Sequence, residues 1–149
     1  MKFLVVLACF IVLSSSLDQD FKEKFMQQME EYGTKCIDEV HATDADIAEL
    51  VAHKVPPTSH EAKCLIFCIH KSFKMMTEDG NPNTEGVLQL MAPLKETDSD
   101  IYEKFLKIAE KCSNSLEKDD DHCVTASNWA ACGINEAKAM GMPDDLFQM

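Results

Sequence analysis

Apolar residues recur every three or four positions along most of the chain, which is the spacing of amphipathic helices. The first such stripe has lysines and glutamates between its members and predicts a helix from about residue 19 to 38. Its apolar members are Phe21, Phe25, Met29, Tyr32 and Cys36. No segment shows the strict alternation of a half-buried strand, so the pattern predicts an all-α fold.

Five more helices are predicted from similar stripes and from the residues that begin and end them. The third helix is apolar around more than one stripe, which is typical of a helix that packs on several sides. A capping box of Thr58 and Glu61 predicts its start. The five helices are expected within 42–54 with Thr43 or Asp44 as the cap, from Thr58 to about Met76, from Asn83 or Thr84 to Pro93, from Asp98 or Ser99 to about Cys112, and from the acidic run at 119–121 to Gly141.

Residues 1–16 have the layout of a secretory signal peptide. A single Lys2 precedes an unbroken apolar run from Phe3 to Leu13, and three serines follow as small residues at the cleavage site. The run is shorter than the roughly 18 residues that a membrane span needs, which argues against an anchor. We therefore expect a signal peptide over 1–16 and a single secreted domain over 17–149.

Removal of the signal peptide would leave 13 lysines, no arginine and 26 acidic residues, a net charge of −13 with neutral histidines. Nucleic acid and anionic lipid both require clustered cations, so this balance argues against them as partners. The mature chain would also keep six of the seven cysteines. An even number of cysteines in an oxidising compartment favours three disulfides.

The pairing of the six cysteines is open, because six cysteines allow fifteen connectivities. They are Cys36, Cys64, Cys68, Cys112, Cys123 and Cys132, separated by 27, 3, 43, 10 and 8 residues. Cys64 and Cys68 lie stacked along one helix face, so a bridge between them would strain the helix. Excluding it leaves twelve pairings, among which physical reasoning alone does not choose.

This cysteine spacing, on six predicted helices behind a signal peptide, resembles that of the insect odorant-binding proteins, which include the pheromone-binding and general odorant-binding proteins. The resemblance implies a compact six-helix domain around an apolar cavity. It also implies bridges from Cys36 to Cys68, from Cys64 to Cys123 and from Cys112 to Cys132. The implied function is a secreted carrier that binds odorants, pheromones or similar small hydrophobic molecules and transports them through sensillar lymph or another body fluid.

The resemblance also implies partners. It indicates a small hydrophobic ligand, delivery at an odorant receptor or a membrane surface, and a monomer or weak homodimer; no cofactor is expected. The same scaffold would equally serve as a non-sensory carrier of lipids, hormones or plant compounds, or as a secreted interaction protein without a ligand. The sequence does not separate these uses.

Seven positions, counted from the cysteines, are assigned by the resemblance to the lining of the cavity. They are Met29, Ile66, His70, Met75, Leu106, Ala109 and Trp129. Phe25 and Phe105 lie one helical turn from such positions and are expected neighbours. The eight methionines of the mature chain suit an adaptable lining, although each of these residues would serve equally well as ordinary core.

His70 is the polar member of this set. A neutral imidazole donates from one nitrogen and accepts at the other, so His70 would hydrogen-bond a ligand hydroxyl or carbonyl. The alternative is a histidine that points to solvent beside Lys71. Two pH devices are also considered. One is the set of five histidines, because a free imidazole titrates near neutrality, and the other is the tail MPDDLFQM, which offers Leu146 and Phe147 as a candidate lid.

Metal binding and catalysis fit the sequence less well. His60, Cys64 and Cys68 share a helix face, but six cysteines in a secreted chain favour bridges over metal ligation. Their spacing is not Cys-x-x-Cys, which argues against a redox motif. His122 lies beside acids and Cys123, yet a bridged cysteine is no nucleophile, and no Gly-x-Ser-x-Gly, His-Glu-x-x-His or phosphate loop occurs. We expect neither a metal site nor an enzyme.

Overall fold

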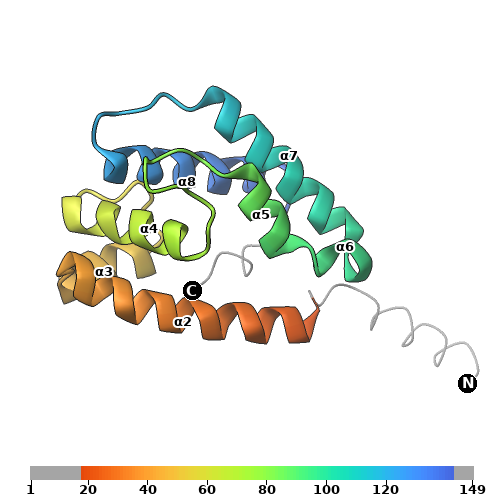
Figure 1. The fold of residues 1–149 in the computed structure, drawn as a ribbon, viewed down its shortest axis with the longest axis horizontal. Coiled ribbons are helices and arrows are strands. Elements are labelled where there is room, and N and C mark those ends of the chain that lie inside the picture. Colours follow the sequence, from red (N-terminus) through yellow and green to blue (C-terminus); the bar gives the residue numbers. More distant parts are fainter. Residues whose placement is uncertain (1–17, 143–149) are drawn as a thin grey trace, which may run out of the picture.

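The computed structural model describes residues 18–142, so the predicted signal peptide and the candidate lid residues Leu146 and Phe147 lie outside the described residues. Within that range the chain is all-helical, as predicted, and it has seven helices (Figure 1). The helices are α2 (Gln19–Val40), α3 (Asp44–Val51), α4 (His60–Ser72), α5 (Thr84–Met91), α6 (Leu94–Thr97), α7 (Ser99–Ser115) and α8 (His122–Ala139). Six of them correspond to the six predicted helices, and α6 is a single extra turn after Pro93. None of the described helices combines the length and the apolarity that crossing a bilayer requires.

Side-chain caps set most of the helix starts. Thr43 and Asp46 form a reciprocal capping box at α3. Asn83 caps α5, Asp98 caps α7 and Asp121 caps α8 through their side-chain oxygens. These caps were among the starts predicted from the sequence.

Helix α4 differs from its prediction at both ends. Ser59, not Thr58, is the N-cap, and its hydroxyl accepts a hydrogen bond from the Ala62 amide at 3.0 Å. The predicted capping box is wrong because the Glu49 carboxylate of α3 binds the hydroxyl and amide of Thr58. The helix ends at Ser72 rather than near Met76, because Lys74 adopts a left-handed backbone conformation with a φ of 58°.

Helix α4 is the centre of the fold, since it packs against α2, α3 and α8 (Figure 1). A second group forms where α7 packs against α5, α6 and α8. Helix α8 belongs to both groups, and disulfides join it to α4 and to α7. The three disulfides confirm the pairing that the family resemblance implied. They join Cys36 of α2 to Cys68 of α4, Cys64 of α4 to Cys123 of α8, and Cys112 of α7 to Cys132 of α8.

Candidate ligand cavity

A cavity of about 250 Å³ lies between the two groups of helices. Its walls come from α2, α3, α4, α5, α7 and α8 and from the connections after α3 and α4. Seven of the nine residues expected at the pocket line it: Met29, Ile66, His70, Met75, Phe105, Ala109 and Trp129. The structure therefore brings these residues together around one space, while their contact with a ligand stays a prediction.

Phe25 and Leu106, the other two expected residues, are not part of this lining. The ring of Phe25 stacks on that of Phe73 with centroids 5.2 Å apart, and Phe73 itself lines the cavity. Phe25 thus forms a second layer behind the wall. On α7 the cavity-facing stripe runs through Phe105 and Ile108, so Leu106 lies one helical step off that stripe.

Helix α8 supplies a part of the wall that the sequence reasoning missed. Beside Trp129, the small residues Ala130, Gly133 and Ala137 line the cavity at helical steps of three and four. A Cβ added at Gly133 would make an ordinary van der Waals contact with Ile108 at 3.9 Å, so a methyl group fits at this position of the wall. Small residues at helical spacing next to a large aromatic ring are the sequence signal that would have found this wall.

The segment at the end of α3 was missed as well. Leu50, His53 and Val55 line the cavity, and Leu50 and Val55 are half-buried. The side chain of His53 is exposed, so it lies where the cavity meets solvent. These residues have no neighbouring cysteine from which a lining position is counted, which is why the family pattern did not include them.

His70 and Trp129 form the polar part of the cavity. Their rings meet edge to face with centroids 5.4 Å apart, and both residues belong to the lining. His70 Nδ1 and Trp129 Nε1 are buried and have no hydrogen-bond partner within residues 18–142. Desolvation lowers the pKa of His70 to about 4, so the imidazole is neutral near pH 7. The solvent-facing alternative for His70 is therefore excluded.

The rest of the lining restricts what the cavity can hold. Among the described lining residues there is no carboxylate, lysine, hydroxyl or free thiol, so the polar side-chain atoms that face a bound molecule are ring nitrogens of His53, His70 and Trp129. A charged molecule would lose its hydration without compensation here. A mostly apolar molecule with one neutral polar group matches these walls, because His70 and Trp129 have buried ring nitrogens available.

Comparison with known proteins gives a consistent result. The profile of the PBP/GOBP family matches residues 18–136. General odorant-binding protein 28a of Drosophila melanogaster is 30% identical over 139 residues, which are 93% of this chain and 96% of the relative. General odorant-binding protein 19d of the same species is 31% identical over 112 residues, 75% of this chain and 73% of the relative.

The structural comparison agrees with the sequence comparisons. A solved odorant-binding protein from Drosophila melanogaster superposes with a TM-score of 0.68 at 28% identity, covering 81% of this chain and 98% of that one. The family profile, the relatives and the fold therefore all indicate an odorant-binding protein. The cysteine pairing is also the one that the resemblance implied. The chain belongs to the PBP/GOBP family of insect odorant-binding proteins.

Proposed function

We propose that this protein is an extracellular carrier that binds one small, neutral, mainly apolar molecule in the cavity. The observation that carries the proposal is the cavity of about 250 Å³, whose walls are apolar apart from histidine and tryptophan nitrogens. An empty apolar cavity destabilises the surrounding structure, and a ligand that fills it restores the missing dispersion contacts. The names of the relatives, which describe odorant-binding proteins, support a volatile semiochemical as the ligand.

Displacement of a fluorescent naphthylamine probe tests whether the cavity is the binding site. The variant Gly133→Leu places a side chain in the cavity, because Gly133 lines it and a Cβ there meets its nearest neighbour, Ile108, only at 3.9 Å. Gly33→Leu is the matched control, since Gly33 is also inside a helix, has nothing within 4 Å of an added Cβ and does not line the cavity. We expect Gly133→Leu to weaken probe binding at least about tenfold and Gly33→Leu to leave it unchanged. Equal affinities for both variants would mean that the probe binds elsewhere.

The polar part of the cavity predicts which ligands are preferred. His70→Ala should weaken alcohols and aldehydes far more than hydrocarbons of equal length, because only the former hydrogen-bond the imidazole. Ile69→Ala is the matched control, as Ile69 is an apolar lining residue beside His70. We expect this control to weaken both ligand classes equally. Equal losses of both classes in His70→Ala would contradict a hydrogen bond from His70.

We further propose that the carrier delivers its ligand to an odorant receptor. A carrier that serves olfaction must be made where odorants enter, whereas a carrier of lipids, hormones or plant compounds would be made in gut, haemolymph or reproductive tissue. The tissue in which the transcript occurs distinguishes the two uses. Absence of the transcript from sensory tissue would leave the cavity assignment standing and remove the olfactory role.

A further inference from the structure

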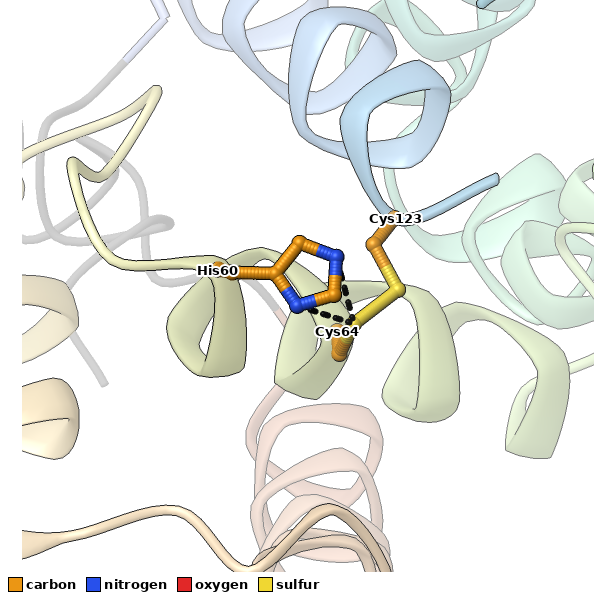
Figure 2. Close-up of side chains that lie close together, drawn as sticks. All are labelled: His60, Cys64 and Cys123. Carbon is orange, nitrogen blue, oxygen red and sulfur yellow. Dashed lines mark hydrogen bonds between the residues drawn. A yellow bond between two sulfur atoms is a disulfide. The ribbon is translucent and has the colours of Figure 1, made fainter. Parts of the chain in front are cut away.

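Away from the cavity, one histidine lies against a disulfide. The imidazole of His60, at the start of α4, has Nδ1 at 3.7 Å and Nε2 at 3.8 Å from the sulfur of Cys64, as Figure 2 shows. Its Nε2 is also 2.7 Å from Oδ2 of Asp121, the N-cap of α8. The imidazole therefore sits between a carboxylate and a sulfur of the bridge that joins α4 to α8.

The Cys64–Cys123 bridge is the most exposed to solvent of the three disulfides. Both of its cysteines are only half-buried, and the side chain of His60 is 59% exposed. The Cys36–Cys68 bridge is buried at both residues, and in the Cys112–Cys132 bridge Cys112 is 1% exposed. Since thiol–disulfide exchange needs an incoming thiolate in line with the bond, access alone favours the Cys64–Cys123 bridge.

His60 contacts the sulfur of Cys64, and one atom each of His60, Cys64 and Cys123 lie within 4.8 Å of one another. Asp121 Oδ1 accepts a hydrogen bond from the Cys123 amide at 2.8 Å, so the carboxylate that holds His60 is itself fixed by the backbone of α8. Desolvation would raise the pKa of Asp121, but the hydrogen bonds from His60 and the backbone outweigh it and the pKa is lowered, so the carboxylate stays ionised. A protonated His60 would stabilise a thiolate at Cys64, because its ring contacts that sulfur.

We propose that the Cys64–Cys123 bridge is a reaction site for small external thiols, with His60 as the proton donor to the leaving sulfur. The incoming thiolate attacks Sγ of Cys123 and forms a mixed disulfide there, while the Cys64–Cys123 bond breaks and its electron pair goes to Sγ of Cys64. Protonated His60, held by Asp121 through Nε2–H, passes its Nδ1 proton to that sulfur. The products are a Cys123 mixed disulfide, a Cys64 thiol and a neutral imidazole.

Charge around the site indicates which thiols react. Glu61 follows His60 on α4, and Asp119 and Asp120 precede Asp121; all three are exposed. An anionic thiol is repelled by this group, whereas a cationic aminothiol is attracted. The co-reactant is accordingly a small neutral or cationic thiol.

Opening this bridge would act on the cavity. It joins α4, which contributes Ile66 and His70 to the walls, to α8, which contributes Trp129. With the bridge open, α4 and α8 keep their packing and the His60–Asp121 hydrogen bond but lose their covalent link, so the cavity is expected to become less tightly closed. The site would thus let a thiol loosen the hold on a cavity ligand.

The same cluster does not support a metal site in this state of the protein. One atom each of His60, Cys64 and Cys123 lie within 4.8 Å of one another, which is close enough for a shared ion. Both sulfurs are joined in the disulfide, however, and thiolates are the form of cysteine that ligates metals.

Limited reaction with cysteamine, followed by alkylation of free thiols and peptide mass mapping, tests the proposal on the intact protein. We expect the first product to carry cysteamine on Cys123 and an alkyl group on Cys64, and mercaptoacetate to react more slowly than cysteamine. First opening of either of the other two bridges would overturn the proposal, and so would a Cys64 adduct.

His60→Ala tests the proton donor. We expect the Cys64–Cys123 bridge to open about tenfold more slowly, measured against the other two bridges in the same sample so that a general loss of stability does not imitate the effect. Imidazole added to the buffer should restore part of the rate. His122→Gln is the matched control, an exposed histidine next to Cys123 whose ring packs on Phe67 instead. An unchanged rate in His60→Ala, or slowing that imidazole does not relieve, would refute the role of His60. Neither result bears on ligand binding, so the carrier function stands or falls separately.

Discussion

Acidification should destabilise this protein through His70. Desolvation lowers the pKa of His70 from 6.5 to about 4, so between these values the unfolded chain binds a proton that the folded state excludes. Since the unfolded state then binds more protons, the free energy of unfolding falls as pH falls from 6.5 to 4, and His70 has no effect well above pH 6.5. The loss works out at about 2 kcal/mol at pH 5 and about 3 kcal/mol at pH 4.

Urea unfolding at pH 7, 5 and 4, followed by the fluorescence of the single tryptophan, measures this loss. His70→Gln keeps a polar side chain that does not titrate, so its stability should fall less than that of the wild type by about 2 kcal/mol at pH 5. His122→Gln removes an exposed histidine and should follow the wild type. Parallel pH curves for the wild type and His70→Gln would show that His70 is not kept neutral by burial.

Ligand affinity should respond at a lower pH than stability does. A neutral ligand binds the folded state in which His70 is uncharged. In the folded protein His70 becomes protonated only near pH 4. The apparent dissociation constant should therefore rise about twofold at pH 4 and about tenfold at pH 3, with little change at pH 5. A large loss of affinity already at pH 5 to 6 would place the responsible group elsewhere in the chain.

Three further outcomes are expected. Gly86→Ala should lower stability by about 2 kcal/mol or more in thermal unfolding, because its Cβ would overlap the Lys74 carbonyl oxygen, while Gly33→Ala should raise it by up to about 1 kcal/mol. Complete reduction of the chain without residues 1–16 should add six hydrogens to its mass, with no thiol titrating beforehand; a smaller gain would mean that one of the three bridges does not form. Deleting residues 143–149 should alter ligand affinity or its pH dependence, and no change in either would rule out the candidate lid.

The helices could be predicted from the sequence because each depends on local signals. Apolar spacing placed all six longer helices, and the caps at Thr43, Asn83 and Asp98 were recognisable as side chains that accept from the first turn. The start of α4 was misjudged because the decisive contact is not local. Glu49 binds Thr58 from another helix, and no pattern within 58–61 reveals that competition.

The cavity could be predicted only in part, because its walls depend on how the helices face one another. Positions counted from the cysteines located Ile66, His70 and Trp129, since the bridges fix those stretches relative to one another. The stretch around His53 carries no cysteine and was missed. Physical reasoning on the spacing left twelve disulfide pairings open, so the correct pairing came from the family resemblance.

The bridges and the cavity depend on each other in a way that predicts the effect of losing a bridge. Cys112 lies in the cavity wall on α7, and its bridge to Cys132 holds α7 against α8. The Cys36–Cys68 bridge instead joins α2 to α4 within a separate buried cluster that includes Leu65. Each bridge is worth about 3 to 4 kcal/mol in the chain-entropy model, so removing either should cost similar stability. Of these two bridges, the loss of Cys112–Cys132 is expected to weaken ligand binding more strongly, because Cys112 lines the cavity and neither Cys36 nor Cys68 does.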